Sequence, residues 1–477
     1  MGASPCGGLA SRIETKLSTD PTGEPHGSHY KLARKRVNQR RGAPSGSPPV
    51  TPNPDSPRGP RPGRSGDPGS RGFDWRDWFD PRRVGWLNLM LVFVPIGIAL
   101  RVAGVGETWQ FVAAGLAIIP LAGLMGESTE HLAHKLGPGI GGLMNATFGN
   151  AAELIIALFA LFRGYDEVVK ASITGSIIGN LLLVMGASLL AGGLKWPRLQ
   201  FNRTAAGVGS TMMVLAAFGM LIPAIFYSLP EVLRVAREEG QDRRLFLEHE
   251  LSVGVCIILM LTYVLYLVFS LKTHQNLFNP DAEEGSPDES LHGHGPGWSM
   301  SRAVGTLLVA TSFVAIMSEI LIGAVEHTSQ AFGLSEVFVG VIIVAIVGNA
   351  AEHSTAILVA LKNKMDLSVG IAIGSALQIA LFVAPVLVFA SYLREEPMDL
   401  LFTTLEVVAV LLAVFIARMV AEDGESNWLE GAMLLMIYAI LAVAFFVLPG
   451  GEGGHPPGPG SAGEIGAVEA APGDPGP

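Results

Sequence analysis

The chain alternates between long apolar runs and short polar connections over most of its length. Each run has about 17–25 residues, the length at which an α-helix crosses a bilayer, whereas barrel strands would be shorter and would alternate in polarity. We therefore predict an all-α, polytopic membrane protein with about eleven transmembrane helices. The predicted spans are residues 86–103, 110–126, 140–162, 168–192, 204–227, 250–271, 302–325, 333–360, 368–391, 401–419 and 428–448.

Polar segments flank and divide this apolar region. Residues 1–85 carry 15 Lys and Arg against 8 Asp and Glu, and both this segment and 449–477 are rich in Pro, Gly and Ser. Such segments bury too little apolar surface to offset the entropy of ordering, so we predict two disordered tails. The polar loop 272–299, acidic and His/Gly-containing, separates the first half, 86–271, from the second, 300–448. The basic N-terminal tail predicts a cytoplasmic N-terminus.

The composition indicates the lipid bilayer as a partner and gives little further information about function. Hydrophobic residues make up 49% of the chain and charged residues 16%, and the net charge of −10 combines an acidic body with a basic tail. The two cysteines, Cys6 and Cys256, imply no disulfide framework. No nucleic-acid partner is expected, and the sequence leaves the oligomeric state open.

One pentapeptide occurs twice within the apolar region. Gly-Asn-Ala-Ala-Glu occupies 149–153 and again 348–352, 199 positions apart, and with this offset 126–180 overlays 325–379 without a gap. The copies fall in the third and eighth predicted spans. A separation of five spans gives them opposite orientations in the membrane, as in the inverted repeats of secondary transporters. We predict one N-terminal helix followed by two inverted five-helix repeats.

Each pentapeptide places a carboxylate where a charge is costly, and such residues usually face a cavity and have a function. Glu153 and Glu352 together neutralise one divalent cation, and without the ion they would take up protons, because two close carboxylates cannot both stay ionised. Gly149 and Gly348 allow close helix approach. An unwound turn at the first copy would add carbonyl oxygens, ligands that suit Ca²⁺. We predict Glu153 and Glu352 as the metal ligands, with Ca²⁺ and H⁺ competing for them.

Other polar residues are candidates for ion binding or proton coupling. Asn150 and Asn349 either ligate the ion or form interhelical hydrogen bonds. Ser176, Ser375 and Gln378, with Asn180 nearby, add polar groups to spans four and nine, where small residues also serve helix packing. Glu127 and Glu130 end the second span, and Glu319 and Glu326 lie in and at the end of the seventh. Glu127 and Glu326, which the repeat relates, either recruit cations or relay protons at opposite faces of the membrane or are interfacial residues solvated by water. Glu130 and Glu319 are further candidates. His353 either aids proton coupling or is a core histidine.

These motifs resemble those of a known family. Residues 149–155 (GNAAELI) and 347–385, beginning VGNAAEHSTAIL, are similar to the two repeats of the Ca²⁺/H⁺ antiporters, the cation/proton exchangers of the Ca²⁺/cation antiporter superfamily. Residues 126–130 (GESTE) resemble that family's second-span motif. The resemblance covers about 86–448 and implies an eleven-helix fold with proton-driven Ca²⁺ uptake or extrusion. It implies Glu153 and Glu352 as central ligands, Ca²⁺ as transported substrate and no cofactor, in a plasma or inner membrane or a vacuole-type membrane.

Three other functions are weighed against this one. Na⁺/Ca²⁺ exchangers typically carry Thr-Ser-x-Pro-Glu where this chain has Asn-Ala-Ala-Glu, and exchange of another divalent cation such as Mn²⁺ stays open. An intramembrane protease would show His-Glu-x-x-His or Gly-x-Ser-x-Gly, and neither pattern is present, so no enzyme is expected. A cation channel fits an inverted repeat with one central carboxylate pair less well than alternating access does.

Overall fold

The structure, a computed structural model, describes residues 89–238, 241–278 and 298–448, and these are almost entirely helical. The elements, in chain order, are η3 Met90–Val92, α2 Phe93–Val102, α3 Glu107–Phe148, α4 Ala151–Phe162, α5 Asp166–Ile178, η4 Gly179–Val184, α6 Met185–Lys195, β1 Leu199–Gln200, α7 Arg203–Ser228, α8 Pro230–Glu238, α9 Gln241–Val268, η5 Phe269–Thr273, α10 Gln275–Phe278, α11 Met300–Gly323, α12 Val325–Phe332, α13 Glu336–Phe338, η7 Val339–Val344, α14 Ala345–Leu361, α15 Met365–Gln378, η8 Ile379–Val383, α16 Ala384–Ser391, α17 Thr404–Ala421, β2 Glu425–Ser426 and α18 Trp428–Val447.

Nine helices within the described residues are long and apolar enough to cross a bilayer. Two shorter apolar helices, Met90–Val102 and Ala151–Phe162, accompany them. The prediction of an all-α, multi-pass membrane protein is therefore confirmed. The tails predicted to be disordered and most of the 272–299 loop lie outside the described residues.

The third predicted span, 140–162, is wrong as a single helix. Its first part is an extension of α3 beyond Gly137, where φ of 82° and ψ of 170° bend the chain, a conformation that glycine adopts without a Cβ clash. The helix ends at Phe148, the chain passes through Gly149 and Asn150, and α4 begins at Ala151. The turn expected at the first pentapeptide is present. In the second copy, α14 runs through the pentapeptide without interruption.

Unlike the turn at Gly149 and Asn150, a π-helical segment occurs in both repeats. In the first repeat, π-helical η4 follows α5, and in the second, π-helical η8 follows α15 at the equivalent place in the sequence. A π-helical segment widens the turn and is often found at functional sites. Asn180 lies within η4, and Gln378 immediately precedes η8. The same backbone irregularity therefore presents an amide side chain in each repeat.

The two halves meet where α5 of the first crosses η7 of the second. A Cβ on Gly175 would lie 2.0 Å from the carbonyl oxygen of Val341, and a Cβ on Gly340 would lie 2.6 Å from the Cβ of Ala171. The backbones therefore approach as closely as small residues permit, the usual basis of helix association in membranes. This crossing fixes α5, which carries Ser176, against the segment leading into α14.

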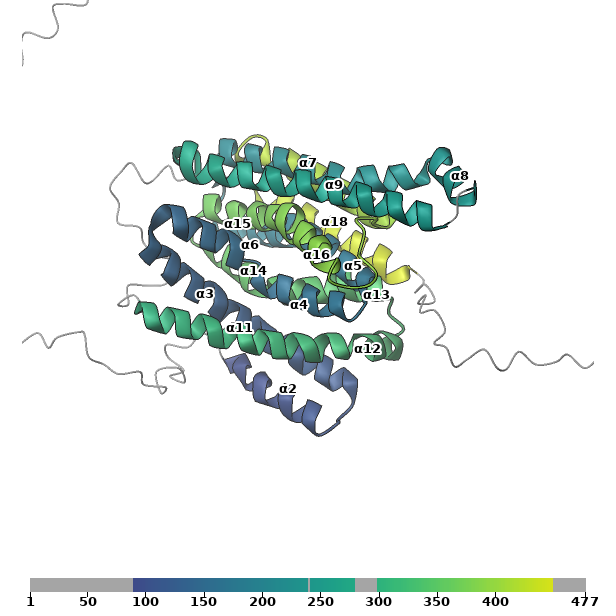
Figure 1. Ribbon diagram of the computed structural model, residues 1–477. Helices are drawn as coiled ribbons and strands as arrows, with labels where there is room; N and C mark the ends of the chain where they lie inside the picture. Colours follow the sequence, from purple (N-terminus) through teal and green to yellow (C-terminus); the bar gives the residue numbers. More distant parts are fainter. Residues whose placement is uncertain (1–88, 239–240, 279–297, 449–477) are drawn as a thin grey trace, which may run out of the picture. The chain divides into compact units, whose positions relative to one another are not determined.

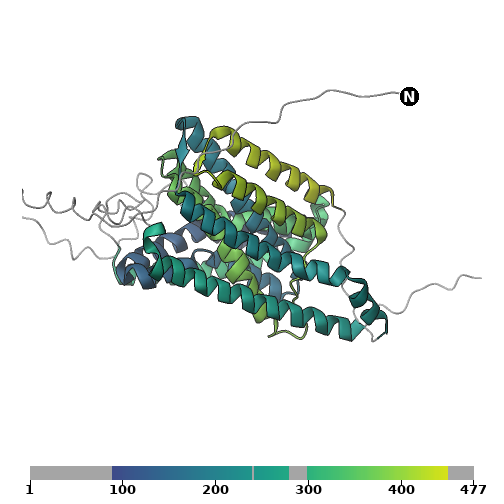
Figure 2. The same cartoon turned by 90° about the horizontal axis from the view of Figure 1, so that it is seen from above.

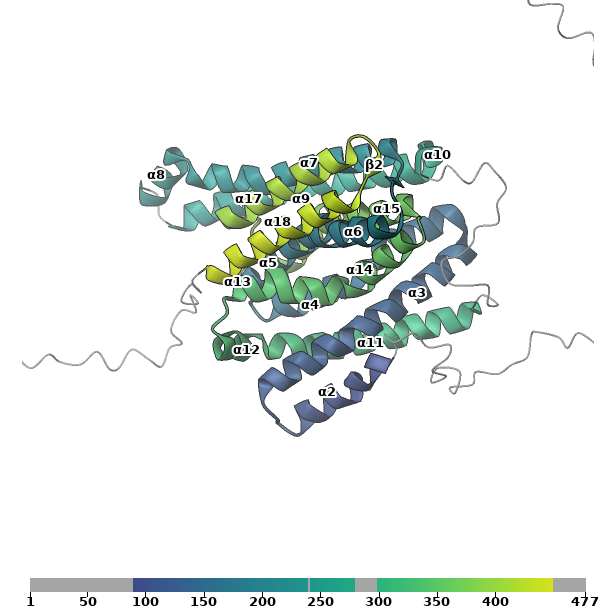
Figure 3. The ribbon, with the colours of Figure 1, turned by 180° about the vertical axis from the view of Figure 1, so that it is seen from behind.

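Successive helices run through the bundle in alternating directions, so the connections between them lie at two opposite ends (Figure 1). The turns 163–165, 324–335 and 392–403 lie at one end, called here the α12 end. The bend at Gly137, α10 and the turn 362–364 lie at the other, called here the α10 end. Figure 3, from behind, shows α12 and α10 at opposite ends of the bundle.

The remaining helices of the two halves pack beside this crossing. Figure 2 shows α7 and α9 side by side, joined at one end through α8; α17 packs against α7, and α18 packs against α6. At the α10 end, β1 pairs with β2 in a short antiparallel ladder that matches Leu199 with Ser426. The connection between α6 and α7 is thereby tied to the connection between α17 and α18.

We predict that Gly175→Ala destabilises the bundle, because its methyl group has no room beside the Val341 carbonyl. Overpacking of this kind costs about 1–3 kcal/mol, which is read as a fall in the melting temperature of the detergent-solubilised protein. The repeat-related Gly374 is the matched control, since a Cβ there meets nothing within 4 Å. Equal melting temperatures for Gly175→Ala and Gly374→Ala would contradict this account of the crossing.

Candidate functional site

The two pentapeptide glutamates lie in the membrane-spanning region, each against a glycine of the other repeat. Glu153 lies in the first turn of α4, and Glu352 lies in the middle of α14. A Cβ on Gly348 would be 3.0 Å from Cγ of Glu153, and a Cβ on Gly149 would be 3.4 Å from Oε1 of Glu352. Each glycine thus provides the space that the carboxylate of the opposite repeat occupies. The predicted residues Glu153, Glu352, Gly149 and Gly348 are brought together.

The two carboxylates differ in their surroundings. Glu153 is 6% exposed, and both of its oxygens are buried without a hydrogen-bond partner among the described residues. Glu352 is half-buried, and its Oε2 likewise has no partner there. Neither forms an ion pair within the described part of the chain. A carboxylate in this position needs a cation or a proton to offset the loss of hydration.

Amide and hydroxyl side chains surround the pair in a network that crosses between the repeats. Asn150 donates through Nδ2 to Oε1 of Gln378 at 2.6 Å and accepts at Oδ1 from Ser375 at 2.9 Å. Asn349 donates to Oγ of Ser176 at 2.9 Å. Each pentapeptide asparagine therefore bonds to a serine of the opposite repeat, as the inverted symmetry requires.

Asn180 joins the two parts of this network. Its Nδ2 lies 3.1 Å from both Oδ1 of Asn349 and Oγ of Ser375, and 3.0 Å from the carbonyl oxygen of Ser176. Its own Oδ1 is buried and without a partner among the described residues. The sequence interpretation placed Asn180 only near the site. Its position one turn after Ser176, on the same helical face, was the available signal.

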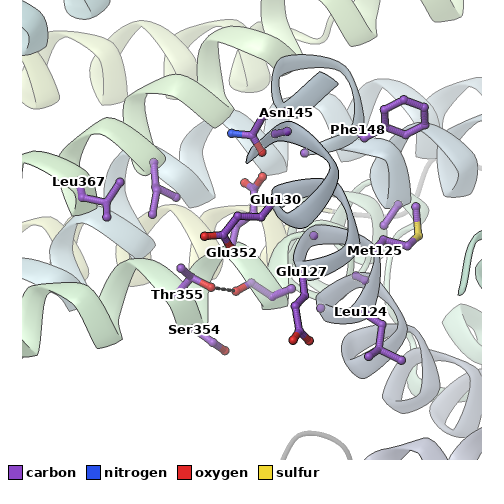
Figure 4. A pocket seen from close by; sticks show the side chains of 18 of the residues that line it. Leu124, Met125, Glu127, Glu130, Asn145, Phe148, Glu352, Ser354, Thr355 and Leu367 are labelled. Atoms are coloured by element: carbon purple, nitrogen blue, oxygen red, sulfur yellow. Dashed lines mark hydrogen bonds between the residues drawn. The ribbon is translucent and has the colours of Figure 1, made fainter. Parts of the chain in front are cut away.

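A cavity extends from Glu352 toward the α10 end, where Gly137 lines it. Figure 4 shows the part of the cavity around Glu352. The cavity has a volume of about 880 Å³ and lies between α3 on one side and α14 and α15 on the other. Glu127, Glu130 and Glu352 line it, together with Gly149 and Gly348, whereas Glu153 does not. Figure 4 shows the three glutamates around the cavity, with Thr355 on the α14 wall. In this conformation one of the two carboxylates faces a route to the α10 end.

Glu319, Glu326 and His353 belong neither to the cavity lining nor to the amide–hydroxyl network. Glu319 forms an ion pair with Arg163 at 3.5 Å, and Glu326 accepts a hydrogen bond from Tyr165 at 3.4 Å. Both contacts lie at the α12 end. His353 has a buried Nε2 without a partner among the described residues. The structure therefore separates Glu319 and Glu326 from Glu127 and Glu130.

The donor set suits a hard cation. It consists of carboxylate, amide and hydroxyl oxygens, which are the ligands that Ca²⁺ prefers in flexible coordination. No group of three or more His, Cys, Asp or Glu side chains able to hold a metal ion occurs in the described ranges. The site accordingly differs from the closed nitrogen and sulfur sites of zinc proteins.

Comparison with known proteins identifies relatives along most of the apolar region. The sodium/calcium exchanger protein family matches residues 106–272 and 302–447. The Ca²⁺/H⁺ antiporter of Synechocystis is 46% identical over 374 residues, which are 76% of this chain and 97% of that protein. The Ca²⁺/H⁺ antiporter ChaA of Bacillus subtilis is 45% identical over 365 residues, covering 76% and 99% of the two chains.

A solved structure is similar as well. The crystal structure of the Ca²⁺/H⁺ antiporter YfkE superposes with a TM-score of 0.63 at 41% identity. The match covers 78% of this chain and all of that one.

We predict that Asn180→Leu destabilises the bundle by about 1–2 kcal/mol, since interhelical hydrogen bonds in membranes contribute about 0.6 kcal/mol each on average. Thermal unfolding in detergent measures the change. Ser188→Ala in α6 is the control, because the Ser188 hydroxyl is buried without a partner among the described residues. If the two variants unfold at the same temperature, the network does not hold the repeats together.

Proposed function

We propose that this chain, which belongs to the sodium/calcium exchanger protein family and to the Ca²⁺/H⁺ antiporters within it, exchanges Ca²⁺ for H⁺ across a membrane. The observation that carries the proposal is the arrangement of Glu153 and Glu352. Two carboxylates from inverted repeats, neither with an ion-pair partner among the described residues, lie at membrane depth, and Glu352 faces a cavity while Glu153 is enclosed. This is the geometry expected of an ion site that is exposed to one side at a time.

The chemistry follows from charge balance. Ionised Glu153 and Glu352 carry a combined charge of −2, which one Ca²⁺ neutralises. The remaining coordination comes from oxygens near the pair, and the amides of Asn150 and Asn349 and the hydroxyls of Ser176 and Ser375 are the candidates. When Ca²⁺ leaves, two protons restore neutrality, because two adjacent buried carboxylates repel each other when both are ionised. Ca²⁺ and H⁺ thus compete for the same oxygens.

Directional transport requires that the site faces the two sides of the membrane alternately. The cavity supports exchange with the α10 end in the present conformation, where Glu127 and Glu130 attract cations toward Glu352. His353, next to Glu352, is a further candidate for proton coupling. Inverted repeats allow the same site to face the other side after one part of the bundle rocks against the rest.

The main alternative is that another ion drives the exchange or is transported. The family as a whole includes exchange driven by Na⁺, and relatives named as vacuolar cation/proton exchangers leave room for a second divalent ion such as Mn²⁺. The strong similarity to proteins named Ca²⁺/H⁺ antiporters favours protons over Na⁺. Uptake of ⁴⁵Ca²⁺ into vesicles under an imposed proton gradient, with and without a protonophore, tests the proposal directly.

The chain is an integral, multi-pass membrane protein. We assign the N-terminus to the cytoplasm because the first 85 residues are basic, and this places the α10 end on the cytoplasmic side. Relatives occur both in bacteria and as vacuolar transporters, so a plasma or inner membrane and a vacuole-type membrane are both consistent with them.

Glu153→Gln and Glu352→Gln are each expected to abolish Ca²⁺/H⁺ exchange while the protein still inserts. Glutamine keeps the shape of the side chain and removes one of the two charges that balance the divalent ion. Proton-driven ⁴⁵Ca²⁺ uptake in reconstituted vesicles is the measurement, and Glu250→Gln, at an exposed position within α9, serves as the control. Substantial exchange by either site variant would eliminate the two-carboxylate site.

The apparent Ca²⁺ affinity on a given side is expected to fall as the pH on that side falls. Protonation of Glu153 and Glu352 removes the charge that binds Ca²⁺, and the pair titrates together, so the fall approaches two protons per Ca²⁺ over part of the range. Uptake measured at several pH values and Ca²⁺ concentrations gives this slope. An affinity that is flat between pH 5 and 8, or transport driven by Na⁺ alone, would refute proton competition.

A further inference from the structure

The walls of the cavity belong to two parts of the bundle. One wall is α3, and the other is formed by α14 and α15. Helix α11 packs along α3, as Figures 1 and 3 both show. To close the cavity, α3 must approach α14, and α11 must move with α3 because their packed faces are continuous. Any contact between α11 and the α14 side therefore changes in this step.

Such contacts lie at the α12 end. The turn between α4 and α5 contacts the end of α11 through the Arg163–Glu319 ion pair and contacts α12 through the Tyr165–Glu326 hydrogen bond. A Cβ on Gly323 would lie 3.4 Å from Nη1 of Arg163, so the guanidinium lies close to the end of α11. Burial raises the pKa of Tyr165 most, and the neighbouring Glu326 carboxylate raises it further. The hydroxyl therefore stays protonated at neutral pH and can donate a hydrogen bond.

The same turn is fixed on its other side to the second half. Along one face of α5, Asp166 pairs with Arg394 at 2.5 Å, Lys170 pairs with Asp399, and Thr174 donates to Glu406 at 3.3 Å. Residues 166, 170 and 174 follow one another at intervals of one turn. The turn 163–165 is therefore anchored to the α16–α17 connection, and the contacts to α11 and α12 are the ones able to open.

The inverted repeat identifies a counterpart for the Tyr165–Glu326 contact. The offset of 199 residues relates Glu326 to Glu127 and Tyr165 to Lys364. Glu127 lines the cavity on α3, and Lys364 is exposed in the turn between α14 and α15, at the α10 end. The Arg163–Glu319 ion pair has no charged counterpart pair at this offset, because Arg163 corresponds to Lys362 but Glu319 corresponds to Pro120.

We propose that Tyr165–Glu326 and Lys364–Glu127 are alternating clasps, one at each end of the bundle. The first is closed in the present conformation and holds the α12 end shut. The second closes when α3 approaches α14 and shuts the α10 end. The two repeats share one fold in opposite orientations. The arrangement of the first repeat against the second that now closes the α12 end can therefore also form with the two repeats exchanged, and it then closes the α10 end. The inference rests on the proposed function in that it assumes alternating access.

Disulfide trapping tests the clasps without relying on transport. In a background with Cys6→Ser and Cys256→Ala, the pair Glu127→Cys with Lys364→Cys is expected to cross-link under mild oxidation. The pair Tyr165→Cys with Glu326→Cys is expected to cross-link as well. Each disulfide is identified by mass spectrometry of the peptides. Glu107→Cys with Lys364→Cys, at opposite ends of the bundle, is the control and is expected to stay reduced. Failure of the 127–364 pair to cross-link, while the 165–326 pair does, would overturn the proposal.

A transport measurement distinguishes a clasp from simple charge attraction, because the two predict opposite changes in the KM for Ca²⁺ at the α12 end. Glu326→Gln weakens the closed clasp, so the KM for Ca²⁺ at the α12 end is expected to fall about two- to fivefold, the effect of an exposed contact, while the KM at the α10 end rises. If Glu326 only attracts cations, removing its charge raises the KM at the α12 end instead. Arg234→Gln, which breaks the exposed Arg234–Glu238 pair within α8, is the control and leaves both values unchanged.

The two measurements separate the possible failures. Cross-linking of both clasp pairs in a protein that shows no Ca²⁺/H⁺ exchange would support the clasps and reject the proposed function. Normal exchange with KM values that move in the same direction at both ends would retain the function and reject the clasps. If Glu326→Gln inserts poorly, Tyr165→Phe replaces it, because it removes only the hydroxyl and changes no charge.

Discussion

Among the residues that the structure describes, no positive charge pairs with Glu153 or Glu352, and the rest of the structure depends on this constraint. In a bilayer this leaves the pair with two ways to be neutral, a bound divalent cation or bound protons. The surrounding features serve that requirement. Glycine at 149 and 348 brings each carboxylate against the opposite repeat, and the amide–hydroxyl network fixes the helices without introducing a basic group that would hold the pair permanently ionised.

The network also explains why the repeats are joined so closely at α5. Its hydrogen bonds are made by short side chains, and these reach between helices only if the backbones are close. Gly175 and Gly340 provide that approach, and η4 turns Asn180 toward both Asn349 and Ser375. Packing and polar contacts are therefore parts of one arrangement. A change that separates the helices at Gly175 also lengthens bonds near the carboxylates.

Much of this could be predicted from the sequence, and the reasons for the exceptions are physical. Apolar run length identifies the helices, and the repeated pentapeptide identifies the inverted halves and the central glutamates, because both signals are local. The turn expected at Gly149 and Asn150 is present, but its absence from the second copy could not be read from two identical pentapeptides, since only the first copy follows a bend such as that at Gly137. The partners of Glu319 and Glu326 were likewise invisible, because Arg163 and Tyr165 are about 160 residues away in sequence.

The cavity has an electrical consequence. The open cavity between α3 and α14, lined by Glu127 and Glu130, carries the potential of the α10 side into the bundle as far as Glu352. The voltage across the membrane then falls mainly over the layer between the carboxylates and the α12 end. Moving one elementary charge through that layer costs or yields about 2.3 kcal/mol per 100 mV. The step at the α12 end is therefore the one most sensitive to membrane voltage, whereas loading from the cavity proceeds almost at constant potential.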